Sequence, residues 1–210
     1  MGVPILVLGR SGTGKSTSLM SMPADECVIL NVAGKPLPFR DKKRKADRPT
    51  YRQIIATLKA NKERCYVIDD ANYLMAFESF DRAQQKGYEK FTDMAVHFKE
   101  LMDAAAQTDD DTTVYIMMHV ETGDDGYVRP KTIGKMLDNQ LCIEGLSPLV
   151  LMATRDADGY GFDTQTNGYT PAKSPIGLFE SARIPNDLKS VDDAVRDYWG
   201  MKPRKDAAAK

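Results

Sequence analysis

The sequence is poor in the residues that build metal centres and disulfide frameworks. Its 210 residues include three cysteines and two histidines, and Cys27, Cys65 and Cys142 are widely spaced, without a C-x-x-C pair. Zinc sites and disulfide-rich folds need such residues at close spacing. We therefore expect neither kind of site, and this use of cysteine is typical of a reducing cytosol.

The sequence also lacks an excess of positive or negative charge, and it lacks long apolar runs. The 29 lysines and arginines nearly balance the 30 acidic residues, and the net charge is −1. An electrostatic partner must therefore be met by a local patch. No apolar run approaches the roughly 20 residues that span a bilayer. The chain also enters an expected strand at residue 3, without a signal peptide. We expect a cytoplasmic protein with no membrane partner.

Short apolar segments alternate with helical patterns along the chain. The expected strands lie near residues 3–8, 27–33, 65–69, 113–119 and 148–153, and the expected helices near 15–22, 50–62, 74–107 (broken at Gly87) and 134–144. This alternation predicts a single α/β domain over residues 1–200, with a mainly parallel sheet flanked by helices. Thr50 is a candidate N-cap for the helix expected near 50–62. The Asn167-Gly168 pair predicts a C-terminal β-hairpin. A final helix is expected over 187–199, and a flexible basic tail over 201–210.

The most specific motif follows the first expected strand. It is the phosphate-loop pattern G-x-x-x-x-G-K-S, and the residues expected to bind a nucleotide are Gly9, Arg10, Ser11, Gly12, Thr13, Gly14, Lys15, Ser16 and Thr17. Its glycines let backbone N–H groups converge on phosphate oxygens. Lys15 would reach the β- and γ-phosphates, while the Ser16 hydroxyl would ligate Mg²⁺. The motif predicts a nucleoside-triphosphate site, with ATP and Mg²⁺ as the expected cofactors.

Two acids end the third expected strand. The apolar run Cys65-Tyr66-Val67-Ile68 leads directly into Asp69 and Asp70. In parallel α/β sheets the ligand lies beyond the carboxyl ends of the strands. We therefore expect Asp69 to join Ser16 at Mg²⁺. Asp70 would either orient a water molecule or cap the next helix.

The fourth expected strand also ends in a polar group, His119, which is followed by Val120 and Glu121. In phosphate-loop ATPases a polar residue at this place can contact the γ-phosphate or a water molecule and report hydrolysis to the following loop. A histidine that merely caps the strand end is the alternative. His97 lies within a helical run and is expected to be structural.

The segment 121–135 is rich in glycine and charge. It contains Arg129, Lys131 and Lys135, and we expect a long loop. Long polar loops often take part in function. The loop would grip the phosphates of a polynucleotide, cover the bound nucleotide, or be merely mobile.

A second basic segment spans residues 35–52 and carries a net charge of about +6. Its candidate contacts to nucleic-acid phosphates are Lys42, Lys43, Arg44 and Lys45, with Phe39 and Tyr51 as nearby aromatic residues for base stacking. A solvated charged loop is an equally good interpretation.

Taken in order, these motifs resemble the RecA-like ATPases of bacteriophages, particularly the Sak-type single-strand annealing proteins. The matching segments are Gly9–Ser16, Val28–Gly34, Val67–Asp70, Pro130–Lys135, Val150–Met152, Tyr160–Gln165, Ala172–Pro175 and Ile184–Leu188. The resemblance implies a RecA-like core that binds ATP and Mg²⁺. It further implies binding and annealing of single-stranded DNA, in the cytoplasm of an infected bacterium. A ring or filament of identical subunits, and a single-strand DNA-binding protein, are the implied partners.

The chain departs from this family near the end of the second strand. Family members carry a glutamate there that polarises the attacking water, whereas this chain has Ala33. A positioned base is worth about 10²–10⁴ in rate. We therefore expect slow hydrolysis, with Asp70 or Glu121 as the replacement group.

RecA-like cores commonly complete their site with a cation from the neighbouring subunit. Lys173 is the candidate here, with Arg155 second, and a loop lysine in solvent is the alternative. Two other functions stay open. One is a nucleoside or nucleotide kinase, and the other is a nucleotide-dependent assembly factor without a DNA role.

Overall fold

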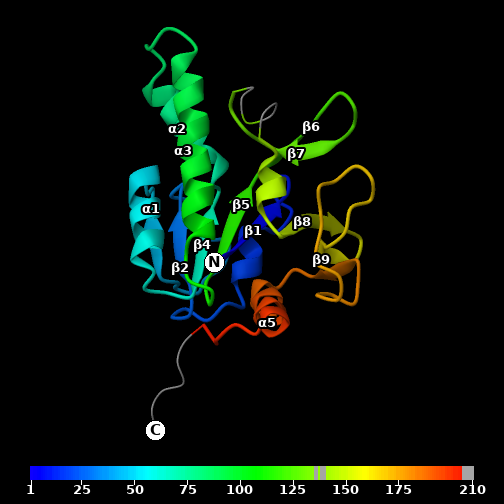
Figure 1. Ribbon diagram of the computed structural model, residues 1–210. Coiled ribbons are helices and arrows are strands. Elements are labelled where there is room, and N and C mark those ends of the chain that lie inside the picture. Colours follow the sequence, from blue (N-terminus) through cyan, green and yellow to red (C-terminus); the bar gives the residue numbers. More distant parts are fainter. Residues whose placement is uncertain (135–136, 138–140, 205–210) are drawn as a thin grey trace.

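The structure of the protein is a computed structural model that describes residues 1–134, 137 and 141–204. A central β-sheet is flanked by helices on both of its faces (Figure 1). The strands of this sheet are β1 (Val3–Leu8), β2 (Val28–Asn31), β3 (Lys45–Asp47), β4 (Cys65–Asp69), β5 (Thr113–Met118), β8 (Leu149–Asp156), β9 (Gly159–Asp163) and β10 (Arg183–Pro185). The predicted α/β class is thus confirmed.

The sheet is parallel except at one edge. Over the described residues its eight strands are ordered β10-β9-β8-β1-β5-β4-β2-β3. The pairs from β8 to β3 are parallel, whereas β9 and β10 are antiparallel additions. The strand β1 therefore lies between β5 and β8, and its carboxyl end opens at the same edge as those of β4 and β5. This edge holds the phosphate-loop motif.

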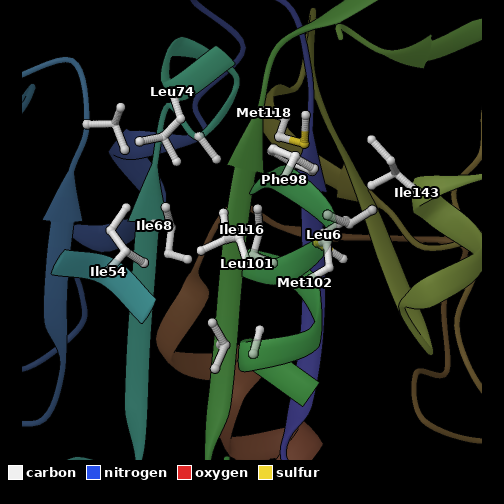
Figure 2. Close-up of a cluster of buried hydrophobic side chains, with 14 of the residues drawn as sticks. Leu6, Ile54, Ile68, Leu74, Phe98, Leu101, Met102, Ile116, Met118 and Ile143 are labelled. Atoms are coloured by element: carbon white, nitrogen blue, oxygen red, sulfur yellow. The ribbon is translucent and has the colours of Figure 1, made fainter. Parts of the chain in front are cut away.

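The apolar residues of the inner strands alternate between two hydrophobic cores. On one face, α1 (Tyr51–Ala60), α2 (Asn72–Asp81) and α3 (Glu89–Ala106) pack on side chains such as Leu6, Ile68 and Ile116 (Figure 2). On the other face, the 3-10 turn η1 (Ser16–Leu19) and α5 (Leu188–Trp199) cover side chains such as Ile5 and Val67. Strands buried on both faces explain the continuous apolar runs of the sequence.

The helix boundaries follow local capping chemistry. Thr50 forms a capping box with Gln53 at the start of α1, which confirms the predicted N-cap. The long helical run is interrupted near Gly87, whose φ of 95° suits glycine, and α2 and α3 are separate helices. Asp187 caps α5 by accepting hydrogen bonds from the backbone N–H groups of Lys189 and Ser190.

The helix predicted over 15–22 is wrong in length. The structure has only η1 there, because hydroxyl groups compete for backbone acceptors in a segment rich in serine and threonine. The Ser18 hydroxyl donates to the Lys15 carbonyl at 2.6 Å, and the Ser21 hydroxyl donates to the Ser18 carbonyl at 3.5 Å.

The long loop predicted over 121–135 is also corrected, because its first part pairs with itself. An antiparallel ribbon, β6 (Val120–Thr122) with β7 (Val128–Pro130), stands beside the main sheet. The helix predicted over 134–144 falls partly outside the described residues, and a 3-10 turn, η2 (Ile143–Leu146), occupies its end.

The predicted C-terminal hairpin exists with a different turn. Strands β8 and β9 are joined next to Gly159, which follows Asp158. Asn167-Gly168 instead lies in the loop between β9 and β10. There the Asn167 side chain accepts a hydrogen bond from the Tyr169 N–H at 2.9 Å. This dipeptide makes a local turn, but the next strand to pair with β9 comes much later in the chain.

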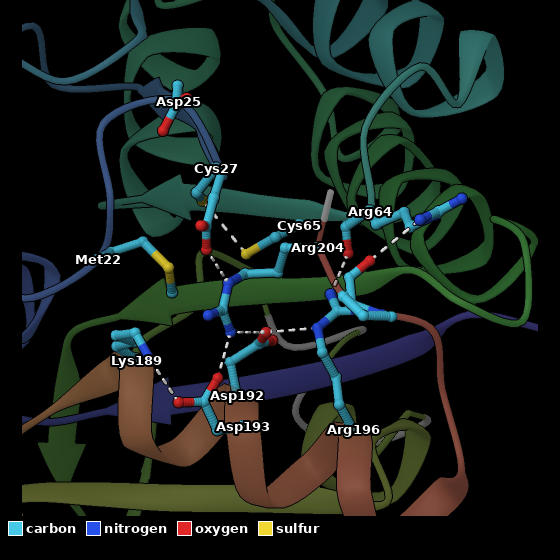
Figure 3. A network of polar contacts seen from close by, with 12 residues as sticks. Met22, Asp25, Cys27, Arg64, Cys65, Lys189, Asp192, Asp193, Arg196 and Arg204 are labelled. Atoms are coloured by element: carbon cyan, nitrogen blue, oxygen red, sulfur yellow. Dashed lines mark hydrogen bonds and ion pairs between the residues drawn. The ribbon is translucent and has the colours of Figure 1, made fainter. Parts of the chain in front are cut away.

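The start of the predicted flexible tail, residues 201–204, is held in place. The Arg204 side chain is only 8% exposed and contacts Glu26, Asp192 and Asp193 (Figure 3). The flexible-tail prediction is therefore wrong for these four residues. Residues 205–210 lie outside the described part of the chain.

Asp192 is the centre of this polar network. Its fully buried carboxylate accepts hydrogen bonds from the Thr113 and Tyr115 hydroxyl groups at 2.7 and 2.8 Å. It also accepts from the Arg196 and Arg204 guanidinium groups at 2.6 and 2.9 Å. The network ties α5 and the end of the described chain to β5.

No helix within the described residues is long and apolar enough to cross a membrane.

We expect Asp192→Ala to destabilise the fold by about 3–5 kcal/mol, because it leaves the buried Arg196 guanidinium without its carboxylate and takes one of three carboxylates from Arg204. Urea unfolding followed by circular dichroism measures the change. Lys189→Ala is the matched control on the same helix, since it removes only a partly exposed pair with Asp193 and should cost about 0–1 kcal/mol. Equal losses in the two variants would contradict this account of the network.

Candidate functional site

The phosphate-loop motif occupies the carboxyl end of β1. The Gly9 N–H donates to the Met118 carbonyl at 3.2 Å, which fastens the start of the loop to the end of β5. Gly12 and Gly14 have φ values of 79° and 95°, in the left-handed region that favours glycine. The sequence pattern thus marks the positions where the backbone needs these conformations.

Lys15 is folded back against its own loop. Its Nζ donates to the Gly9 and Arg10 carbonyl oxygens at 2.7 and 3.0 Å, and the residue is only 5% exposed. Burial lowers the pKa of this ammonium to about 8, although Asp70 and Asp69 act in the opposite direction. Among the described residues Lys15 has no direct carboxylate contact, and a buried cation of this kind suits a site that receives an anion.

Ser16 and Asp69 come together from distant parts of the chain. The Ser16 hydroxyl donates to Asp69 Oδ1 at 2.9 Å. Burial, followed by repulsion from Asp70, raises the pKa of Asp69 to about 6. A hydroxyl and a carboxylate are hard oxygen donors, and Mg²⁺ is commonly held by one or two such groups together with phosphates and waters. These two predicted metal ligands therefore fit a phosphate-bound Mg²⁺.

The number of possible metal ligands also bears on the kind of metal site. Within the described residues, no group of three or more histidine, cysteine and acidic side chains could hold a metal ion. The described side chains therefore do not form a metal site built from protein ligands alone. Ser16 and Asp69 suit an ion that arrives with the nucleotide.

Asp70 connects three neighbouring strand ends. It has a φ of 60°, an unusual backbone conformation for a residue other than glycine. Its carboxylate forms an ion pair with Lys35, which follows β2, at an Nζ–Oδ2 distance of 2.6 Å. His119 Nε2, beyond β5, lies 3.2 Å away. Burial acts to raise the pKa of Asp70, but the contacts with His119 and Lys35 outweigh it, and the pKa is lowered.

Of these two contacts, the one between Lys35 and Asp70 is the shorter. The His119 contact lacks hydrogen-bond geometry, and Nε2 has no hydrogen-bond partner within the described residues. The His119 backbone N–H is held by Asn72 Oδ1 at 3.1 Å, and its ring meets Tyr73 edge-on. His119 therefore lies at the strand end, as predicted, with an available ring nitrogen.

These groups line one small cavity of about 210 Å³, and its lining is Ser11, Gly12, Gly14, Lys15, Ser16, Thr17, Asn31, Lys35, Pro36, Pro38, Asp69, Asp70 and His119. Gly9, Arg10 and Thr13 shape the loop without lining the cavity. The Thr13 hydroxyl donates to the Arg10 carbonyl at 2.9 Å, and the Arg10 guanidinium donates to Thr122 Oγ1 at 3.0 Å.

A second cavity, of about 550 Å³, adjoins the first. Lys35 and His119 line both cavities. Arg10, Glu121 and Lys131 line the second one only. We refer to the two as the phosphate cavity and the adjacent cavity. Glu121 thus lies near the site but outside the phosphate cavity.

Several predicted contacts are not part of either cavity. Lys173 forms a backbone bridge with Val150, and Arg155 stacks over Tyr160. Arg129 is paired with Asp125 at 2.6 Å and lies over Tyr127. Lys135 lies outside the described residues. A role for Lys173 in a neighbouring subunit remains a prediction.

The basic segment 35–52 is only partly available as a phosphate-binding surface. Lys43 is wrong as a DNA contact, because its side chain is 6% exposed and its Nζ donates to the Met20 and Met22 carbonyls. Arg44 is paired with Glu63, and Lys45 is paired with Asp47. Lys43, Arg44 and Lys45 are thus all engaged by other groups of the protein.

The predicted stacking aromatics are occupied in a similar way. Tyr51 packs against His97 with ring centroids 5.7 Å apart. Phe39 packs against a core, and Lys43 lies over its ring. Lys42 remains exposed, as does Lys131 on the rim of the adjacent cavity.

The sequence interpretation missed Lys35 as a site residue, although a usable signal existed. Lys35 follows the carboxyl end of β2, and the rule that identified Asp69 and His119 applies equally to that strand end. Its pairing with Asp70 depends on the order β4-β2 within the sheet, which the sequence did not specify.

Comparison with known proteins returned structural neighbours only. No family model matches the chain, and no curated protein matches it. One similar solved structure is an ATPase from the type III secretion system of pathogenic bacteria. It has 13% sequence identity and a TM-score of 0.48, over 74% of this chain and 52% of that one. Another is the Legionella pneumophila ATPase DotB, with 12% identity and a TM-score of 0.40, over 97% of this chain and 54% of that one. The chain spans about half the length of each.

We expect the folded protein to gain stability relative to a Lys15→Met variant as the pH rises from about 8 to 10.5. The lowered pKa means that the folded state releases this proton before the unfolded chain does, so that unfolding must take it up again. The difference in unfolding free energy should grow by up to about 1.4 kcal/mol per pH unit. Urea titrations at several pH values measure it, and parallel profiles for the two proteins would refute the shifted pKa.

Proposed function

We propose that this protein binds Mg²⁺–ATP through its phosphate cavity and works as a RecA-like, slowly hydrolysing ATPase on single-stranded DNA. The nucleotide proposal rests on one observation: Lys15, Ser16 and Asp69 line the same cavity beside a glycine-rich loop. A loop of this kind binds phosphate oxygens through its N–H groups. The lysine supplies positive charge, and the hydroxyl and carboxylate supply oxygen ligands for a divalent ion.

Each residue then has a defined task. Lys15 would leave its own carbonyl partners to contact the β- and γ-phosphates. Ser16 and Asp69 would hold Mg²⁺, which neutralises charge on the phosphates. Asp70 and His119 face the same cavity from the ends of β4 and β5 and would orient water or report the state of the γ-phosphate.

Slow hydrolysis is supported by the end of β2. Ala33 follows that strand and brings no carboxylate to the cavity. Of the two replacement bases considered, Asp70 is engaged by Lys35, and Glu121 lies in the adjacent cavity. A general base that must first be released or moved contributes little to the rate.

The adjacent cavity supports the DNA part of the proposal. Arg10, Lys35 and Lys131 bring three cations to its lining, next to the place proposed for the γ-phosphate. A positively charged groove that follows the backbone is typical of proteins that bind single strands. This position would couple the nucleotide state to a DNA strand, as the resemblance to the Sak-type annealing proteins implies.

Self-assembly is supported by the loop between β9 and β10. Ile176 is 97% exposed and Tyr169 is 62% exposed. Lys173 lies on the same loop, so that a neighbouring subunit packed on this surface would receive a cation close to the contact. A ring or filament of identical subunits would result from such a head-to-tail contact.

Phosphoryl transfer to a small acceptor is the second candidate function. The adjacent cavity of about 550 Å³ favours it, since this volume falls within the range of about 300–1,000 Å³ for small-molecule sites. DNA binding with a steep salt dependence supports the first function, whereas transfer of phosphate to a nucleoside without DNA binding supports the second.

Lys15→Ala should weaken ATP binding by at least about tenfold, because the phosphates lose a charge-assisted contact. Isothermal titration calorimetry with ATP and Mg²⁺ measures the change. Lys62→Ala is the control, since it removes one exposed lysine before the opposite end of β4. Undiminished binding by the Lys15→Ala variant would leave the nucleotide proposal without support.

Lys131→Ala should reduce the salt dependence of single-stranded DNA binding. Loss of one phosphate contact lowers the slope of log K against log salt concentration by about 0.7 for a single strand. Fluorescence anisotropy with a labelled oligonucleotide across a salt series gives the slope for wild type, Lys131→Ala and Lys62→Ala. If Lys131→Ala and Lys62→Ala have the same slope, DNA does not run along the adjacent cavity.

A further inference from the structure

A turn held by hydrogen bonds places Lys35 at the edge of the phosphate cavity. The Gly34 N–H donates to the Asn31 carbonyl at 3.1 Å, and Gly34 has a φ of 65°. The Asn31 side-chain amide donates to the Lys35 carbonyl at 2.7 Å and to Asp47 Oδ1 at 2.6 Å. Asn31 is itself 1% exposed. The backbone of Lys35 is therefore fixed from the end of β2 rather than left in a free loop.

The Lys35 side chain reaches from solvent toward a buried acid. It is 59% exposed, whereas the Asp70 side chain that it contacts at 2.6 Å is 5% exposed. Its ammonium also lies 5.6 Å from the centre of the Tyr73 ring. Lys35 lines the phosphate cavity together with Lys15, and the two cations are close enough for Lys35 to oppose the charge on Lys15.

This ion pair is open to exchange from the Lys35 side. Lys35 is more than half exposed, so water reaches its ammonium, and His119 Nε2 lies 3.2 Å from the Asp70 carboxylate as a second neighbour. Lysine carries three donors on a flexible stem, so that the ammonium can move a short distance while its backbone stays fixed. A phosphate oxygen in the cavity would compete with Asp70 for this ammonium as a second negatively charged acceptor.

The position within the cavity indicates which phosphate would be contacted. Lys35 faces the side on which Asp70 and His119 lie, and it also lines the adjacent cavity. That side is where the proposed function places the terminal phosphate, beyond the two phosphates cradled by the loop. ADP lacks the group that would reach it.

From this geometry we infer that Lys35 is the residue that distinguishes ATP from ADP, by leaving Asp70 to bind the γ-phosphate. The inference rests on the proposed nucleotide function. It gives a cation of this same chain the charge-neutralising role that many phosphate-loop enzymes assign to a separate finger. Asp70 is then the positioning residue that holds Lys35 when the terminal phosphate is absent.

The test compares the affinities of the 210-residue protein for a non-hydrolysable ATP analogue and for ADP, both with Mg²⁺, by calorimetry. Lys35→Ala should weaken binding of the ATP analogue by about 10-fold or more, because one charge-assisted hydrogen bond is lost. ADP affinity should change less than about twofold. Lys35→Arg should restore most of the preference, and Lys62→Ala should resemble wild type.

Asp70→Asn provides a second readout that does not depend on catalysis. It removes the competing carboxylate, so that binding of the ATP analogue should tighten more when Lys35 is present than in the Lys35→Ala background, where only charge repulsion is relieved. Equal loss of ATP-analogue and ADP affinity in Lys35→Ala, or no loss at all, would overturn the inference while leaving the proposed function standing. A wild-type protein that binds neither nucleotide would overturn both.

Discussion

The parallel register between β1 and its neighbours is the constraint on which the site depends. Leu8 pairs with Met118 on one side and with Met152 on the other, so these strands reach the same edge together. The loop that follows β1 therefore emerges beside the ends of β4 and β5. A slip in this register would separate Ser16 from Asp69, and it would also turn buried side chains to the wrong face of the sheet.

Ionisable side chains are concentrated at this edge, and burial disfavours the charged form of each of them. Burial lowers the pKa of Lys15 to about 8 and raises that of Asp69 to about 6. Each ionised form is thus disfavoured in the protein by itself. A polyphosphate and a divalent cation would supply the missing opposite charges, which is why perturbed groups of this kind indicate a functional site. The exposed Lys35 adds a cation whose position can change.

The opposite end of the strands is held by a different kind of contact. The buried Asp192 carboxylate joins α5 to Thr113 and Tyr115 of β5. Nearby, the Cys27 and Cys65 thiols lie 3.3 Å apart and are free (Figure 3). At this end the charged side chains are paired with one another inside the protein, whereas at the carboxyl end Lys15, Asp69 and Asp70 line a cavity. The carboxyl end therefore offers charged groups to a ligand.

The sequence by itself determined the class of fold, the phosphate loop and the acids and histidine that follow two strands, because these patterns are local. Glycine positions and apolar runs report backbone conformation and burial directly. Only the tertiary structure decided that Lys35 meets Asp70, that the Lys43 side chain is buried and that Arg204 joins the network around Asp192. Strand order and long-range pairing control these contacts, and no short segment of sequence contains that information.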